Sequence, residues 1–136
     1  MSTPEQLNQE MAAYLPGHLG IRVTEIANGT VTAEMPMQPH LMATNGFMHA
    51  GSVVTLADTC SGIGCMANLP EGAVSFTTIE LKSNHLGTAR DCTVICTAKG
   101  FHLGRTTQVW DAEVRHKESG KVMALFRCTQ LLIYPR

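Results

Sequence analysis

The amino-acid sequence predicts one α+β domain over residues 1–136, in which a six-stranded antiparallel sheet wraps a long central helix. A short N-terminal helix precedes the first strand. Three observations predict this layout: a two-residue turn signal between alternating runs, a very apolar helical stretch in the middle, and four strand-like runs in the second half. Hydrophobic residues make up 44% of the chain and charged residues 15%, which favours a substantial buried core.

The N-terminal third predicts a helix and then a hairpin. Thr3 followed by Pro4 is a typical helix start, and Pro16-Gly17 is expected to end that helix. Residues 21–26 and 30–35 alternate apolar and polar side chains around Asn28-Gly29, the strongest short hairpin signal. We therefore expect two paired strands after one short helix.

The remaining elements follow from changes in periodicity. Residues 36–48 contain two prolines and are expected to form a loop, and residues 49–68 change to a helical period. Four runs with strand-like alternation come next and predict an antiparallel meander: 74–86, 89–101, 105–116 and 121–134.

Composition excludes several functional classes. Acidic and basic residues nearly cancel, so neither nucleic acid nor a membrane surface is an expected partner. The N-terminus lacks the order of a signal peptide, which favours a cytoplasmic location. The five cysteines form no CxxC pair and are expected to be small buried hydrophobic residues. The six histidines show no zinc-binding spacing on a helix, so no metal site is expected.

The central helix carries one charged residue. On a helical wheel of residues 51–68, Asp58 lies opposite the apolar stripe, on a side of small, nearly uncharged residues. Because a solvent-facing side would carry lysine, glutamate or arginine, this second face is also expected to be covered. A carboxylate in such a place is a candidate base or nucleophile. The alternative is a buried aspartate that hydrogen-bonds a neighbouring group.

The residues before that helix are small. "HAG" brings Ala50 and Gly51 to the first turn, where backbone N–H groups lack helical partners and carry partial positive charge. A substrate carbonyl could approach these N–H groups closely, as in an oxyanion hole. Within the same segment, His49 is either functional or a packing residue at the helix start.

These segments resemble the hotdog-fold acyl-CoA thioesterases of the phenylacetate-degradation (PaaI) type. "GFMHAGSVVTLAD" is close to that family's G-x-x-H-G-G-x-x-x-x-L-x-D pattern. "FTTIELKSNHLGTA" and "GRTTQVWDAEV" are similar to its later strands, and the order of elements matches over residues 20–134. The resemblance implies hydrolysis of an acyl-CoA thioester without a cofactor, CoA being part of the substrate. It also implies a homodimer or homotetramer with active sites at the subunit interface.

The resemblance also implies roles for single residues. Asp58 would activate water or attack the thioester, the N–H of Ala50 or Gly51 would hold the carbonyl oxygen, and His49 would orient the thioester or the loop. A hydroxyl on the following strand of the partner subunit, at Thr78 or alternatively Thr77, would position the water.

Two positions depart from the family pattern. Alanine at position 50 replaces the first glycine of the HGG, although its backbone N–H remains. Ala43 stands where the family has an asparagine, and the nearest amide is Asn45. Either Asn45 takes that role through a shifted loop, or the polar contact is absent.

Two arginines near strand ends are candidates for the CoA phosphates, Arg105 above all and Arg90 as well, because guanidinium groups suit phosphate oxygens. Their alternative is solvated charge. Trp110 and Phe126 are expected to pack in the core or the acyl pocket.

Two other functions stay open at this stage. A hydratase or dehydratase acting on acyl thioesters uses a different histidine–carboxylate arrangement, and a non-catalytic acyl-CoA-binding module would have lost the helix carboxylate.

Overall fold

The structure is a computed structural model that describes residues 2–136, and it confirms the α+β prediction. The central helix and six strands all form, and they are preceded by two short helices. In chain order the elements are α1 (Pro4–Met11), α2 (Leu15–His18), β1 (Arg22–Ala27), β2 (Thr30–Met35), a 3₁₀ turn (Pro39–Leu41), α3 (Ala50–Ala67), β3 (Ser75–His85), β4 (Val94–Leu103), β5 (Thr107–His116) and β6 (Val122–Ile133).

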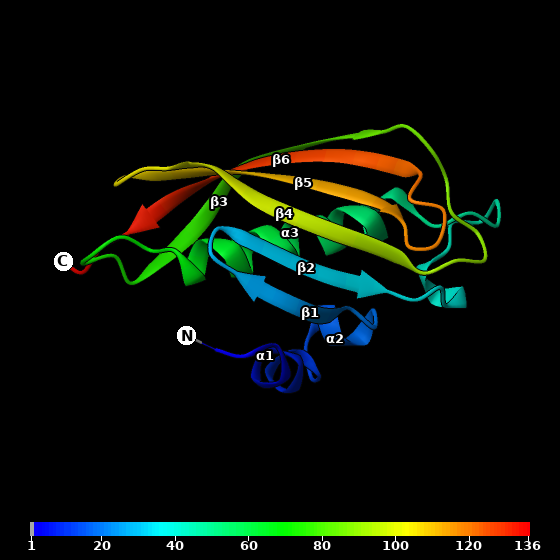
Figure 1. Ribbon diagram of the computed structural model, residues 1–136, viewed down its shortest axis with the longest axis horizontal. Coiled ribbons are helices and arrows are strands. Elements are labelled where there is room, and N and C mark those ends of the chain that lie inside the picture. The colour runs from blue at the N-terminus through cyan, green and yellow to red at the C-terminus, as the bar shows by residue number, and fades with distance from the viewer. Residues whose placement is uncertain (1) are drawn as a thin grey trace.

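The six strands form one antiparallel sheet in the order β1-β2-β4-β5-β6-β3. In Figure 1 this sheet curves in front of α3, which crosses behind β2 and β4. The predicted four-strand meander is wrong in one respect: β3 pairs with β6 at the sheet edge instead of with β4. Residues 86–93 therefore form a connection from that edge to β4, which begins at Val94 and not at residue 89.

The N-terminal prediction needs one correction. The capping box between Thr3 and Gln6 starts α1 as expected, but α1 ends at Met11. Pro16 lies in the first turn of a second helix, α2, where its missing N–H costs nothing. The proline therefore begins a helix where the sequence suggested an end. The β1–β2 hairpin is as predicted, with Ala27 opposite Thr30 and Gly29 at φ 71°.

The core lies between α3 and the sheet. Val53, Leu56 and Cys60 of α3 are buried against inward-facing strand residues, among them Trp110 and Phe126, as predicted. The indole packs directly on the α3 backbone, since a Cβ at Gly64 would lie 2.4 Å from Trp110 Cη2.

Part of the side of α3 opposite the apolar stripe is covered, as expected: Ser61 and Cys65 on that side are buried. The sheet curves around more of the helix than a flat sheet would cover, so the covered arc extends beyond the apolar stripe.

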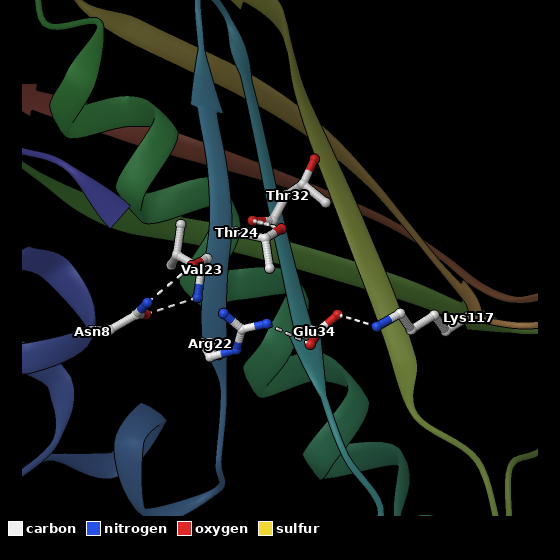
Figure 2. Close-up of polar contacts among 7 residues, drawn as sticks. All are labelled: Asn8, Arg22, Val23, Thr24, Thr32, Glu34 and Lys117. Atoms are coloured by element: carbon white, nitrogen blue, oxygen red, sulfur yellow. Dashed lines mark hydrogen bonds and ion pairs between the residues drawn. The ribbon is translucent and has the colours of Figure 1, made fainter. Parts of the chain in front are cut away.

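A side chain of α1 attaches that helix to the sheet edge (Figure 2). The Asn8 amide donates to the carbonyl of Val23 at 3.0 Å and accepts from the N–H of Val23 at 2.8 Å. The amide thus pairs with β1 as a strand backbone would, and it fixes α1 beside β1 (Figure 1).

Candidate active site

A cleft of about 760 Å³ lies between the N-terminal helices and α3, and Asp58 is part of its wall. Three layers of the fold contribute: the N-terminal segment, the exposed side of α3, and two strands. The lining residues are Ser2, Leu7, Glu10, Pro16, Ile26, Asp58, Thr59, Gly62, Ile63, Met66, Ala67 and Phe76. The small face of α3 predicted to be covered thus lies partly under α1 and α2.

Asp58 sits in the middle of α3, and the residue is partly buried. Its Oδ1 atom is inaccessible to solvent and has no hydrogen-bond partner among the described residues. Burial raises the pKa of the Asp58 carboxyl above its ordinary value, because a charged carboxylate loses hydration there. Hydrogen bonding to a neighbour, the alternative considered from the sequence, does not satisfy this oxygen. A poorly solvated carboxylate beside a cleft can accept a proton or attack an electrophile.

The helix start distinguishes the two candidate N–H donors. His49 is the N-cap of α3, and its Nδ1 accepts a hydrogen bond from the N–H of Gly51 at 2.7 Å. The next two N–H groups, of Ser52 and Val53, both bond the His49 carbonyl. Over residues 2–136, the N–H of Ala50 is left without a partner in the protein. Ala50 therefore offers the free donor, and Gly51 does not.

The loop before α3 uses Asn45 for its own turn. The Asn45 Oδ1 accepts from the N–H of Phe47 at 3.1 Å, and Gly46 adopts a left-handed φ of 86°. The backbone carbonyl of Phe47 accepts a hydrogen bond from the N–H of Ala43 at 2.7 Å. Since Asn45 is also absent from the cleft lining, the structure gives it a turn-forming contact instead of one to Asp58.

The two candidate arginines lie at opposite ends of β4. Arg90 precedes β4, and its guanidinium stacks on Phe47 with 4.4 Å to the ring centroid, close to the start of α3. Arg105 lies in the turn after β4, and its backbone carbonyl accepts a hydrogen bond from Tyr134 Oη. A ten-residue strand, roughly 30 Å long, separates the two. Within one chain, only Arg90 lies near the helix start.

Thr78 and Thr77 lie on β3 at the sheet edge. Thr78 is half-buried and opposite Gln130 of β6, whereas Thr77 is exposed and opposite Leu131. Neither lines the cleft, and the β3 residue that does is Phe76. A hydroxyl from this strand does not reach the cleft of its own chain.

Sequence reasoning missed the contribution of α1. Leu7 and Glu10 form part of the cleft wall, and Phe76 closes it near Gly62. Leu7 and Met11 do show the helical i, i+4 spacing of an apolar face, which was the available signal. The partner of that face could not be read from it, because Asn8 contacts a strand fifteen residues away.

The cysteines lie in the core and lack the character of nucleophiles. All five are free thiols, and four are buried. Burial, with a smaller contribution from Cys128, raises the pKa of Cys65 to about 12, and burial raises the pKa of Cys128 to about 11. Both are therefore thiols at neutral pH, and a thiol is a poor nucleophile.

Residues 2–136 contain neither a metal-binding cluster nor a membrane-spanning helix. No three histidine, cysteine, aspartate or glutamate side chains are grouped so that they could hold a metal ion. None of the helices in this range combines the length and apolar character needed to cross a bilayer.

Comparison with known proteins gives concordant matches. The profile of the Thioesterase superfamily matches residues 45–123. A 1,4-dihydroxy-2-naphthoyl-CoA hydrolase of Escherichia coli is 32% identical over 133 residues, which cover 96% of this chain and 95% of that protein. The crystal structure of a Haemophilus influenzae thioesterase has a TM-score of 0.92 at 30% identity, and the match covers 98% of this chain and 92% of that chain.

A more distant structure supports the fold alone. The PaaI protein of the Escherichia coli phenylacetic acid degradation operon has a TM-score of 0.81 at 23% identity, and the match covers 93% of this chain and 91% of that chain. These likenesses confirm the predicted hotdog fold.

Proposed function

The chain belongs to the thioesterase superfamily, as the resemblance predicted, and we propose that it hydrolyses acyl-CoA thioesters with Asp58 as the catalytic carboxylate. One observation carries this proposal. A carboxylate with a raised pKa and an unpartnered oxygen lines a largely apolar cleft, on the helix whose first N–H is free. These are the groups that acyl transfer requires: a base or nucleophile, and a donor for the carbonyl oxygen.

The proposed chemistry proceeds by one of two routes. As a base, Asp58 takes a proton from water while the water oxygen attacks the thioester carbon, and the C–S bond then breaks as Asp58 gives that proton to the departing CoA sulfur. As a nucleophile, the carboxylate forms a mixed anhydride and expels CoA, after which water cleaves the anhydride. In both routes the N–H of Ala50 stabilises the carbonyl oxygen, and no cofactor is consumed.

His49, the N-cap of α3, is proposed to act together with the N–H of Ala50. Because its Nδ1 accepts from Gly51, the neutral ring carries its proton on Nε2, facing away from the cap bond. We propose that this N–H orients the thioester. Arg90, beside the same helix start, is the better-placed candidate for a CoA phosphate contact within one chain, and Arg105 serves such a role only from another subunit.

The acyl group is proposed to occupy the cleft. Its apolar lining by Ile63, Met66 and Phe76 suits an aliphatic or aryl group, and the related Escherichia coli enzyme is named for a naphthoyl-CoA substrate. The five free thiols support the cytoplasmic location predicted from the sequence.

We further propose a homodimer or homotetramer with sites at the subunit interface. β3 is an edge strand that exposes the apolar side chains of Ile79 and Leu81, and Val74 is exposed just before it. Unpaired apolar edges are natural places for another chain to add. A second copy there would let Thr78 of the partner subunit approach the water, which the chain's own Thr78 does not.

The decisive experiment is Asp58→Asn, tested for CoA release in a thiol-detection assay with short, long and aryl acyl-CoAs. The variant should keep its fold and oligomer and lose activity by at least about a hundredfold. Glu118→Gln, at an exposed position of the β5–β6 turn, is the control and should retain full activity. Wild-type turnover by Asp58→Asn would refute the assignment, and a wild-type protein that binds acyl-CoA without releasing thiol would be a binding module.

The assembly has its own test. Ile79→Lys places a charge on the β3 edge, and we expect a monomer in size exclusion with loss of turnover. Leu86→Lys, which changes an exposed leucine just beyond the strand, should stay oligomeric and active. A wild-type monomer would contradict a shared active site.

A further inference from the structure

The face of the sheet away from α3 carries a hollow of about 580 Å³ that the proposed hydrolysis does not use. Its polar and charged lining comes from β3, β4, β5 and β6. In β5, Asp111, Glu113 and Arg115 alternate with residues that are buried toward α3, so their side chains point to the opposite face. The hollow and the Asp58 cleft therefore lie on different sides of the sheet and share no lining residue.

Positive charge is in excess in this hollow. Its wall contains four basic side chains, Lys82, Lys99, Arg115 and Arg127, and two acidic ones, Asp111 and Glu113. The whole chain has a formal net charge of −1 at pH 7, so the excess of positive charge is local. A concave surface dominated by one sign of charge concentrates small ions of the opposite sign.

The basic groups differ in how well they are paired. Arg127 holds both carboxylate oxygens of Asp111, with Nη2 2.8 Å from Oδ2, and its guanidinium also stacks on Phe101. Lys82 lies directly opposite Arg127, and Lys99 lies directly opposite Asp111. Neither lysine forms an ion pair with a carboxylate of residues 2–136. Because like charges opposite each other on neighbouring strands are unfavourable, an anion above this row would relieve the repulsion between Lys82 and Arg127.

We propose that the hollow binds a small polyphosphate anion, held by Lys82 and Lys99 on either side of the Arg127–Asp111 pair. β6 and β5 lie between the two lysines, so their backbones are roughly 14 Å apart at the usual strand spacing. A chain of two or more linked phosphates fits this row better than a single phosphate group. Asn84 and Thr97, in the next cross-strand row, supply neutral donors for further oxygens.

The size and the charge of the hollow favour a small ligand over a macromolecule. Its volume is that of a small-molecule site. The two carboxylates in its wall and the net charge of the chain disfavour an extended polyanion such as nucleic acid.

Calorimetric titration of the native oligomer with inorganic pyrophosphate, at low and constant ionic strength, tests the site. We expect one pyrophosphate to bind per chain. Lys82→Gln and Lys99→Gln should each weaken binding about tenfold, because each removes a charged hydrogen-bond donor. Asp111→Asn should instead tighten binding, because it removes a negative charge and releases Arg127 for the ligand.

Two further variants show where pyrophosphate binds. Lys121→Gln, in the exposed turn between β5 and β6, removes the same charge outside the hollow and should bind as the wild type does. Arg90→Gln should also bind normally, since Arg90 lies near the start of α3. Loss of binding in Arg90→Gln would place pyrophosphate at that arginine and overturn the proposal. Lys82 and Lys99 are exposed, so their variants should keep the wild-type Tm.

ADP and CoA, titrated in the same way, distinguish a nucleotide from a free polyphosphate. Affinities equal to that of pyrophosphate indicate a free polyphosphate, and tighter binding of ADP indicates a nucleotide. Both results support the site when the two lysine variants weaken them.

A wild-type protein that fails to bind pyrophosphate at millimolar concentration would overturn the proposal, and this is the result expected if a second copy of the chain covers this face. Unchanged affinity in a protein carrying both Lys82→Gln and Lys99→Gln would overturn it as well. Neither result bears on the proposed hydrolysis, which is tested by thiol release.

Discussion

His49 Nδ1 accepts the backbone N–H of Gly51 at 2.7 Å, so the residue that caps α3 does so with its imidazole ring. Serine, threonine, aspartate and asparagine are the usual residues at this position, and their side chains are shorter than that of histidine. The imidazole caps the N–H of Gly51 with Nδ1, and its second nitrogen, Nε2, remains available for another contact. The bond also occupies the donor of Gly51 and leaves that of Ala50 free.

Gly51→Ala should disturb this relationship directly. A Cβ at position 51 would lie 2.9 Å from His49 Nδ1 and 3.2 Å from Cε1, so the ring must move. Because the displaced ring can no longer orient substrate, we expect kcat to fall roughly tenfold or more, while the free energy of unfolding changes by no more than about 1 kcal/mol. Steady-state kinetics and denaturant unfolding measure the two effects.

The control for Gly51→Ala is Thr55→Ala, which removes a hydroxyl that bonds the Gly51 carbonyl at 2.8 Å but does not approach the ring. It should keep kcat within about twofold, since small surface changes have small effects. Full activity in Gly51→Ala would show that the imidazole position is irrelevant to turnover.

Two glycines of α3, two residues apart, should respond differently to alanine. At Gly62 a Cβ would meet the tip of Phe76, Cζ, at 3.1 Å, whereas at Gly64 it would meet the buried Trp110 ring at 2.4 Å. Gly62→Ala should narrow the cleft and raise KM for bulky aryl-CoAs several-fold, with stability maintained by better helix propensity. Gly64→Ala should cost about 1–3 kcal/mol of unfolding free energy, because the core is overpacked.

The comparison needs KM for a short and a bulky acyl-CoA, together with Tm for both variants. Equal KM changes for short and bulky substrates in Gly62→Ala would argue against an acyl group in this cleft.

Asn8→Ala should loosen α1 from β1. Both hydrogen bonds to the main chain of Val23 are lost, which we expect to cost about 1–2 kcal/mol. Because α1 carries Leu7 and Glu10 of the cleft wall, KM should rise more than kcat falls. Hydrogen exchange should quicken in residues 4–11.

Gln6→Ala is the matched control for that experiment. It breaks the α1 capping box with Thr3 but spares the contact to β1. If it raised KM as much as Asn8→Ala, helix stability and not docking would explain the effect.

Glu34 should make stability depend on pH. Its carboxylate bonds Lys117 Nζ and Arg22 Nη2, each at 2.9 Å, and is 13% exposed (Figure 2). The hydrogen bond from Lys117, followed by that from Arg22, holds the pKa of Glu34 below its ordinary value. A depressed pKa stabilises the fold above the unfolded-state pKa, and this contribution is lost as pH falls through the folded-state value.

Glu34→Gln should therefore lower the unfolding free energy by about 1 kcal/mol near pH 7, since both partners are largely solvated. Its deficit against the wild type should be smaller at an acidic pH below the lowered folded-state pKa, where the wild-type carboxylate also becomes protonated. Urea unfolding at the two pH values measures this, and a deficit independent of pH would contradict the ion-pair explanation.

The sequence predicted the local elements well because their signals are local. The Asn28-Gly29 turn sets the register of β1 and β2, and the bounds of β2 agree with the prediction. The position of β3 beside β6 could not be predicted in this way, since alternation along a strand does not say which strand is its neighbour. Pro16 misled for a related reason, because proline is acceptable after a helix and equally at the start of the next.

In the candidate site too, features with a local sequence pattern were predicted and features that depend on long-range contacts were not. The wheel singled out Asp58, which does line a cleft together with Gly62 of the small face, but Ile63 and Ala67, which the wheel placed on the sheet-facing stripe, line that cleft too. The wall from α1 depends on the contact between Asn8 and Val23, which lie fifteen residues apart in the chain. Contacts of this range leave no periodic pattern in the sequence.

The place of β3 at the far edge also has a kinetic consequence. β4, β5 and β6 follow one another through short turns and can assemble early, whereas β3 precedes them and must close a long loop to reach β6. We expect β3 to join the sheet last during folding. Since that step brings Thr78 opposite Gln130 and Phe76 against α3, a refolding chain should recover its secondary structure before its activity.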